Sequence, residues 1–492
     1  MNIRRLLPLL LLLLFSAACA GTAPDPSAQR IDRFIAKAMT QFPEVPAMGV
    51  AVVRDGRTIL TRGYGLRDRE KQLPANDETL FYIASSTKSY MGLLVATLAQ
   101  RGVVDLDAPI ARYVPELRFA EGVKGDKVTL RTLLTHTSGI SNNAIVMRTA
   151  FSGEHTPAGL LEILARSKPI EPKFDYDNLG YVVTGLVLER VTGKPWQELL
   201  ASEVFAPLGM TRTTASMSRT NVWPVATPYD LDRDLRLHPL SFVKTDATMH
   251  AAGGIVTTPR DLARWLEANV NHSGLPATAF AEAQKRQVDT PERDWYRFKR
   301  YAYALGWYHS DYEGATLLHH FGGYEGWRAH VSFLPRQKHG VAIAVNTSAP
   351  GAQLRDLVAA YAYDVLLGKP NVDTAYDAHL AKMRAEADTA RDRIRADLEK
   401  RRQRPPSLQR ARSTYAGRYV NDDLGALTIR EDAGTLRATL GRLDAVLEPF
   451  TEPETARVEL IPGTGEVLRF VYETEERPTA VKYGDEVFRR AE

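Results

Sequence analysis

The sequence is poor in cysteine, with Cys19 the only one in 492 residues. A single thiol near the N-terminus excludes an internal disulfide and a cysteine nucleophile in the body of the chain. Charge of one sign is also scarce, since 63 Lys and Arg stand against 59 Asp and Glu. Because no dense Lys/Arg run occurs in the main body, the composition gives no reason to expect a nucleic-acid partner.

Four well-known functional signatures are absent as well. The chain contains no G-x-S-x-G, no H-E-x-x-H, no G-x-x-x-x-G-K-[ST] and no G-x-G-x-x-G. The α/β-hydrolase, zincin, P-loop and Rossmann classes therefore lack their sequence support. The length suggests about three domains, and the 44% hydrophobic content is enough for a sizeable core.

The first twenty residues, MNIRRLLPLLLLLLFSAACA, form the one long apolar run. Two arginines, a leucine stretch and then small residues have the layout of a secretory signal peptide, predicted at 1–20. The run from Leu6 to Phe15 is shorter than the roughly 20 residues that span a bilayer. A short N-terminal anchor or a buried helix is the alternative.

Two outcomes are open at the end of this leader. Ala18-Cys19-Ala20 fits cleavage before Gly21, whereas Phe15 to Cys19 loosely resembles a bacterial lipobox with Ser16 in place of the usual leucine. The first outcome predicts a periplasmic protein, and the second an outer-membrane lipoprotein tethered through Cys19.

The remaining chain predicts an α+β protein. After a spacer at 21–30, apolar residues from Ile31 to Ala38 have helical spacing, and 48–62 predicts a β-hairpin with a turn at 54–57. Strand-like segments resume near 303, at 315–320, 327–333 and 341–346, and a helix follows at 353–367. Because the β segments flank a helical middle, we expect one antiparallel sheet built from both ends, flanked by helices, with an inserted all-helical lobe.

The C-terminal quarter has two further parts. Residues 376–402 are rich in charge and in strong helix formers and end at Pro405-Pro406, which predicts a solvated linking helix within a linker at 371–410. Short β runs then fill 411–492 and predict a small β-barrel or sandwich. The main domain is accordingly expected at 31–370.

The first chemically suggestive stretch is FYIASSTKSYMG at 81–92. Ser85 and Lys88 match S-x-x-K, and positions i and i+3 share one face of a helix. Lys88 can then reach the Ser85 hydroxyl, provided that burial lowers the pKa of the amine. The alternative is a polar helix start, although an apolar helix has little use for a lysine whose amine is unpaired.

Two more stretches suit the same chemistry. Tyr176 and Asn178, in FDYDNLGY, could present a phenol and an amide to one cavity, although a turn with a packed aromatic residue would look the same. His320, Gly322 and Gly323 lie in a predicted strand, where a backbone N–H could pair with that of Ser85 as an oxyanion hole. A glycine-bearing strand with an edge histidine is the alternative.

On these residues the chain resembles the serine β-lactamase and penicillin-binding protein superfamily, in the branch related to class C β-lactamases. The resemblance covers about residues 31–368. It also includes LRTLLTHTSGI (130–140), NLGYVVTGLVLERVTGKPW (178–196), VFAPLGMTRT (204–213) and AAGGIVTTPRDLARW (251–265). The segment from Tyr415 resembles the lipocalin-like β-barrel appended to some of these hydrolases.

The resemblance implies roles for the matched residues. Ser85 would be the acylated nucleophile, with Lys88 and Tyr176 as its catalytic partners. Asn178 and His320 would bind substrate, and Gly323, preceded by Gly322, would supply the second oxyanion N–H. No metal or organic cofactor is implied.

One position departs from the family pattern. Phe321 stands where relatives have Thr or Ser, whose hydroxyl helps to bind a substrate carboxylate. Losing that donor costs about 1.5–3 kcal/mol. The expected activity is therefore hydrolysis of a small-molecule or peptide substrate at an ester or amide carbonyl that lacks this carboxylate, unless Arg328 substitutes. The alternatives are a D-Ala-D-Ala carboxypeptidase or penicillin-binding protein, a β-lactamase, or a catalytically silent ligand-binding relative. The oligomeric state is left open.

Overall fold

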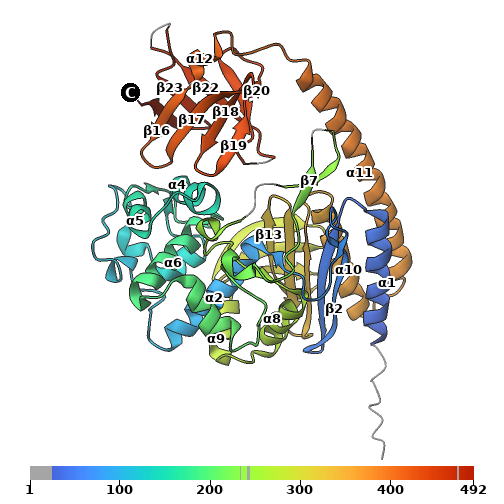
Figure 1. Ribbon diagram of the computed structural model, residues 1–492. Coiled ribbons are helices and arrows are strands. Elements are labelled where there is room, and N and C mark those ends of the chain that lie inside the picture. The colour runs from blue at the N-terminus through green and yellow to red at the C-terminus, as the bar shows by residue number, and fades with distance from the viewer. Residues whose placement is uncertain (1–24, 233, 241–243, 462, 474–475, 492) are drawn as a thin grey trace, which may run out of the picture.

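The computed structural model describes residues 25–232, 234–240, 244–461, 463–473 and 476–491. The predicted leader and Cys19 lie outside these residues. Figure 1 shows a body built on a large sheet, a helical lobe beside it, and a β domain that a long helix connects to the body. Within the described ranges, no helix is both long enough and apolar enough to span a bilayer.

The main sheet is antiparallel and contains strands from both ends of the main domain, as predicted. Its first strand along the chain pairs with its last, with Met48 opposite Val345. The strand order is β10 (Val288–Trp295), β11 (Phe298–Tyr303), β12 (Tyr308–Tyr312), β13 (Ala315–Tyr324), β14 (Trp327–Leu334), β15 (His339–Val345), β1 (Ala47–Arg54), β2 (Arg57–Asp68) and β3 (Leu73–Pro74).

Local sequence explains the turn of the predicted hairpin. It also explains why the segment expected as a spacer is partly helical. Asp55 and Gly56 both have positive φ, as a tight two-residue hairpin turn requires. Helix α1 spans Pro26–Gln41, so the second half of the segment expected as a spacer is helical. The reason is a strong N-cap, since the Asp25 side chain accepts hydrogen bonds from two backbone N–H groups and Pro26 occupies the first helical position.

Strand structure also begins earlier than the sequence indicated. The hairpin of β10 and β11 precedes residue 303 and forms one edge of the sheet. Most of β10 is exposed and carries charged residues and Pro291. A search for apolar runs misses a strand with these features, which are typical of edge strands.

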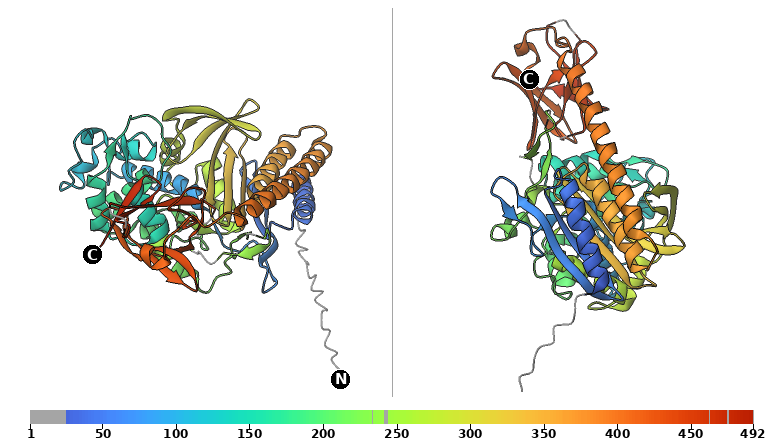
Figure 2. Two further views of the ribbon diagram at one scale, coloured as in Figure 1. Left: turned by 90° about the horizontal axis from the view of Figure 1, so that it is seen from above. Right: turned by 90° about the vertical axis from the view of Figure 1, so that its right-hand side faces the viewer.

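Helices cover both faces of the sheet (Figures 1 and 2). Helices α1 and α10 (Gly351–Leu366) pack on one face, in an apolar cluster with β1 and β15. Helices α2 (Thr87–Gln100) and α8 (Pro259–Asn271) lie on the other face. Helix α2 is buried at every position from Thr87 to Leu98, and Gly102, shortly after its end, has positive φ.

The helical lobe is inserted between these sheet segments, as predicted. It comprises α3 (Leu130–Leu134), α4 (Asn143–Met147), η4 (Arg148–Ser152), α5 (Pro157–Ala165), α6 (Leu179–Thr192) and α7 (Trp196–Leu200), with α9 (Ala277–Gln284) packed against α2.

The C-terminal part follows the predicted order of helix and β domain. Helix α11 runs from Val372 to Arg402 and is exposed over most of its length. A nearly closed, barrel-like sheet of nine strands then begins with β16 (Gly417–Asn421) and ends with β24 (Glu486–Arg490). It contacts the helical lobe through an ion pair of Arg166 with Asp423 at 2.6 Å. A specific likeness to lipocalins stays a prediction.

Close packing of α2 against the loop before β12 gives a first test. A Cβ at Gly92 would lie 1.9 Å from the carbonyl oxygen of Leu305. We expect Gly92→Ala to lower the free energy of unfolding by about 1–3 kcal/mol, because overpacking outweighs the helix propensity gained. Gly159→Ala on exposed α5 is the matched control and should change it by less than about 1 kcal/mol. Urea unfolding of both variants measures this; equal stabilities would contradict the packing.

Candidate active site

Ser85 stands on a strained turn between strand β4 (Phe81–Tyr82) and helix α2. A 3-10 turn over Ala84–Ser86 precedes the helix, and Ala84 has a φ of 45°, which is uncommon for a residue with a side chain. Ser85 is partly exposed, whereas its neighbours on both sides are buried. The turn therefore presents one hydroxyl to the surface from an otherwise buried segment, and such strain is often found at functional sites.

Lys88 lies one turn further on, as the S-x-x-K spacing predicts. Its Nζ is 3.2 Å from Ser85 Oγ, 2.7 Å from Asn178 Oδ1 and 2.9 Å from the carbonyl oxygen of Ala252. The residue is fully buried. Burial lowers the pKa of the amine to about 7, although the nearby Asp177 carboxylate favours the charged form.

Tyr176 and Asn178 lie in the loop that leads into α6. His136 holds this loop, because its backbone oxygen accepts from Asp175 N at 2.9 Å and its Nδ1 accepts from Asp177 N at 3.3 Å. Burial lowers the pKa of His136, which keeps the ring neutral and able to accept. The loop also sits close to α3, since a Cβ at Gly180 would lie 2.1 Å from the Leu133 oxygen.

The Tyr176 phenol reaches Ser85, but it is not prepared to ionise. Tyr176 as a whole is 38% exposed, but the protein packed around its phenol raises the pKa above the ordinary range; the neighbouring Tyr308 adds to the rise, and a hydrogen bond with Ser85 and the charge of Arg300 oppose it. Lys88 Nζ lies 4.9 Å from the centre of the ring. Because the pKa of the Lys88 amine is lowered and that of the Tyr176 phenol is raised, the amine is the better base.

His320 is buried on β13 and faces the same side of the sheet as α2. Its Nδ1 lies 2.8 Å from the Phe321 carbonyl oxygen, so Nδ1 donates, and Nε2 accepts from the Tyr303 hydroxyl at 3.2 Å. Burial and the charge of Lys88 hold its pKa well below the usual range. His320 is therefore neutral, and its ring lies 6.1 Å from that of Tyr176, centre to centre.

The two glycines after His320 let β13 approach the Ser85 turn. A Cβ at Gly322 would lie 1.9 Å from the Ile83 oxygen, so no larger residue fits. Gly323 pairs with Arg328 one step before the two-residue turn between β13 and β14. Because pairs that flank such a turn are hydrogen-bonded and bonding alternates along the strand, the Gly323 N–H points away from β14. On that side β12 has already ended, with Tyr308 opposite His319.

Phe321 and Arg328 do not supply the missing hydroxyl. The Phe321 ring packs in an aromatic cluster, 4.9 Å from Trp295 and 4.6 Å from His319, centre to centre. Arg328 Nη1 donates to the carbonyl oxygens of Tyr324 and Trp327 at 2.5 and 2.7 Å. Phe321 therefore offers no hydrogen-bond donor, whereas Arg328 Nε and Nη1 lie 4.0 Å from the position of a Cβ on Gly323.

Several contacts were not foreseen from the residues alone. Ala252 contributes only its backbone oxygen, which no side-chain motif can reveal, although it lies in the AAGGIVTTPRDLARW segment. His136 lies in the LRTLLTHTSGI segment, but nothing in its type indicated a contact with the 176–178 loop. Tyr303 and Arg300 come from the unrecognised strand β11, and the Arg300 guanidinium lies 4.1 Å from the centre of the Tyr308 ring.

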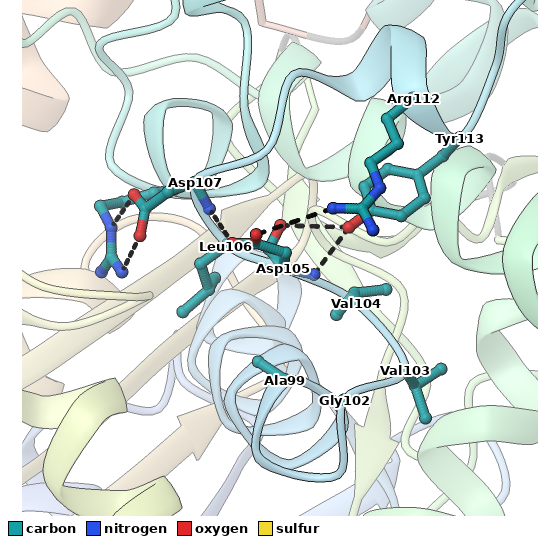
Figure 3. Close-up of a pocket in the computed structure, with 10 residues that line it drawn as sticks. Ala99, Gly102, Val103, Val104, Asp105, Leu106, Asp107, Arg112 and Tyr113 are labelled. Atoms are coloured by element: carbon teal, nitrogen blue, oxygen red, sulfur yellow. Dashed lines mark hydrogen bonds and ion pairs between the residues drawn. The ribbon is translucent and has the colours of Figure 1, made fainter.

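Other parts of the described chain offer weaker candidates. Among the described residues, no cluster of His, Cys, Asp or Glu could hold a metal ion. A depression of about 450 Å³ lies at the far end of α2 (Figure 3), roughly 20 Å from Ser85 by helix length. Its polar groups are paired, for example Asp107 with Arg131 at 2.7 Å and Asp105 N with the Tyr113 hydroxyl at 2.7 Å.

Comparison with known proteins identifies the family of the chain. The model of the Beta-lactamase family matches residues 35–365, which is most of the chain. The chain belongs to the Beta-lactamase family. Ser85, Lys88, Tyr176 and His320 all fall within the matched region of this family member.

Curated relatives are similar over different lengths. The protein flp of Staphylococcus aureus is 26% identical over 65% of this chain and 63% of its own length, so the chain matches less than two thirds of that relative. The unguisins hydrolase of Aspergillus violaceofuscus is 25% identical over 85% of this chain and 80% of its own length, which extends beyond the Beta-lactamase region.

Solved structures share the fold. The octameric penicillin-binding protein homologue from Pyrococcus abyssi superposes with a TM-score of 0.60 at 24% identity and covers 94% of this chain and 99% of its own. The D-amino acid amidase from Ochrobactrum anthropi gives a TM-score of 0.57 at 24% identity and covers 69% and 98%.

The buried amine of Lys88 makes stability depend on pH. Its pKa falls from 10.5 to about 7 on folding, so between these values the unfolded chain binds a proton that the folded chain lacks. Stability should therefore rise by a few kcal/mol as pH increases from about 7 to about 10. Lys88→Met should lack this rise, whereas Lys194→Met, an exposed control, should keep it. Urea unfolding across this range tests the sign; parallel curves for wild type and Lys88→Met would refute the burial argument.

Proposed function

We propose that this protein is an exported serine hydrolase. It hydrolyses an ester or amide bond through an acyl-enzyme on Ser85. The observation that carries the proposal is the set of partners around Lys88 Nζ. Asn178 Oδ1 and the Ala252 oxygen can only accept hydrogen bonds, whereas the Ser85 hydroxyl can also donate one. A neutral amine has two hydrogens and one lone pair, so it satisfies all three partners when the lone pair faces Ser85.

This pairing supports Lys88 as the base for acylation. With a pKa of about 7, the amine is largely unprotonated in weakly alkaline solution. It takes the proton as Ser85 Oγ attacks the carbonyl carbon, and the ammonium ion keeps the same two oxygen acceptors. Serine is a weak nucleophile without such a neighbour.

Tyr176 and two backbone groups complete the proposed chemistry. The neutral phenol of Tyr176, hydrogen-bonded with Ser85, can pass a proton to the departing alcohol or amine while it receives one from the Lys88 ammonium. The N–H groups of Ser85 and Gly323 are assigned to the developing oxyanion. Water then attacks the acyl-enzyme, the same groups take its proton and return it to the departing Ser85 Oγ, and a carboxylic acid and free Ser85 are released.

The environment of Phe321 favours a substrate without a carboxylate beside the scissile bond. The ring is packed against Trp295 and His319, so position 321 offers no hydrogen-bond donor to a carboxylate. A simple ester or amide is the favoured substrate, ahead of β-lactams or D-Ala-D-Ala peptides. A catalytically silent ligand-binding relative is disfavoured, because the hydroxyl, amine and phenol are all in contact. Export rests on the leader at 1–20 and on the cleavage or lipidation motif around Cys19.

The nucleophile is tested by a pair of adjacent serines. We expect Ser85→Ala to lower p-nitrophenyl butyrate hydrolysis at least about 1,000-fold and to abolish labelling by a fluorophosphonate. Ser86→Ala removes a neighbouring hydroxyl that only donates to the His320 oxygen at 3.1 Å, and it should keep both properties. Full activity and labelling in Ser85→Ala would refute the proposal.

Substrate preference is tested with two acylating compounds. Wild-type protein should hydrolyse p-nitrophenyl butyrate, while fluorescent benzylpenicillin should label Ser85 weakly, because binding of its carboxylate is reduced about 10- to 100-fold without the hydroxyl donor. Rates are normalised to the sites titrated with fluorophosphonate. Penicillin labelling as fast as ester turnover would overturn the argument from Phe321, and labelling without any ester turnover would indicate a penicillin-binding role.

A further inference from the structure

A buried cation lies directly behind the glycine pair of β13. Arg355, on helix α10, is 2% exposed, and its Nη1 donates to the Ala329 oxygen at 2.7 Å and to the Gly322 oxygen at 3.4 Å. These carbonyls belong to the two residues that face each other across β13 and β14. One guanidinium therefore binds both strands at the same residue pair.

The Gly322 carbonyl belongs to the same peptide unit as the Gly323 N–H. In a trans peptide the C=O and the N–H point in opposite directions. The carbonyl is directed toward β14 and Arg355, so the N–H is directed toward the open side near Ser85. A charged donor on the carbonyl also polarises the peptide, because hydrogen bonds in a chain strengthen one another.

Other side chains fix the guanidinium in this position. Asp356 accepts from Arg355 Nε at 2.9 Å and from Nη2 at 3.3 Å. The Phe321 ring lies beneath the guanidinium, 4.8 Å from its carbon to the ring centre. Asp356 also accepts from Trp295 Nε1 at 2.9 Å and contacts His330 Nδ1 at 3.2 Å. Phe321, the middle residue of His320-Phe321-Gly322, thus packs against the Arg355 guanidinium.

We propose that Arg355, seated on Phe321, is a positioning residue that aims and polarises the Gly322–Gly323 peptide toward the oxyanion. This inference rests on the proposed function of Ser85. It assigns to helix α10 a part in transition-state stabilisation, although no atom of Arg355 touches the substrate.

The test uses phenylboronic acid, which forms a tetrahedral adduct on an active serine and so reports on the oxyanion site. In Arg355→Lys the charge opposite Asp356 is kept, but a lysine lacks the planar fork that reaches Asp356 and two carbonyls together. Relative to wild type, we expect kcat for p-nitrophenyl butyrate to fall about 10-fold and the boronate Ki to rise by a similar factor, less than the loss caused by removing an oxyanion donor outright. KM should stay within about twofold.

Tyr363→Phe is the matched structural control. It removes one buried hydrogen bond to Ser332 Oγ at 2.7 Å in the same layer, so the melting temperature should fall by a few degrees while kcat and the boronate Ki stay at wild-type values. If Arg355→Lys only lowers the melting temperature, as this control does, Arg355 has a purely structural role and the inference is wrong.

A second pair keeps the test decisive if Arg355→Lys does not fold. Phe321→Leu removes the ring beneath Arg355 and should raise the boronate Ki about threefold, whereas Phe298→Leu, in the same cluster but without a guanidinium above it, should not. Equal Ki values in this pair would overturn the inference. Inactivity of the wild-type protein toward both ester and boronate would instead refute the proposed function.

Discussion

The burial of one amine governs the arrangement of the site. Helix α2 is enclosed along most of its length, so Lys88 cannot reach water and must find its partners inside the protein. Those partners come from three segments distant in sequence: the Ser85 turn, the loop before α6, and the segment at Ala252. A charged amine here would carry a large desolvation cost. Burial therefore lowers the pKa of the amine to about 7, so that it is largely neutral in weakly alkaline solution, as the proposed activation of Ser85 requires.

Backbone contact between elements makes this convergence possible. Helix α2 touches the loop at Leu305 through Gly92, β13 touches the Ser85 turn through Gly322, and α6 touches α3 through Gly180. In each case the missing Cβ leaves room for a carbonyl oxygen of the facing segment. Side chains alone would separate these elements by several ångströms more. The glycines thus set the distances on which the Lys88 contacts depend. They explain how residues from the sheet and from the helical lobe can meet at one site.

Much of this could be predicted from sequence, and the gaps have physical causes. Strand-like segments located β13 to β15, charge and strong helix formers located the linking helix, and the S-x-x-K spacing placed Lys88 beside Ser85. Strands β10 and β11 escaped because exposed edge strands lack an apolar run. The Ala252 oxygen and the Arg355 contacts escaped because they depend on tertiary packing and on backbone atoms, which no residue pattern encodes.

The barrel-like domain is joined to the site through continuous packing. Its Arg442 N donates to the Ser152 oxygen at 3.1 Å, next to Phe151, whose ring stacks 5.7 Å from Tyr324. Tyr324 directly follows Gly323 on β13. Apolar residues of the barrel also belong to the same buried cluster as α2 and the helical lobe. Because contiguous buried clusters tend to open as a unit, loosening the barrel should reach β13 through two aromatic rings. The C-terminal domain is therefore packed as part of the same body as the Beta-lactamase region, although its chain follows the matched residues.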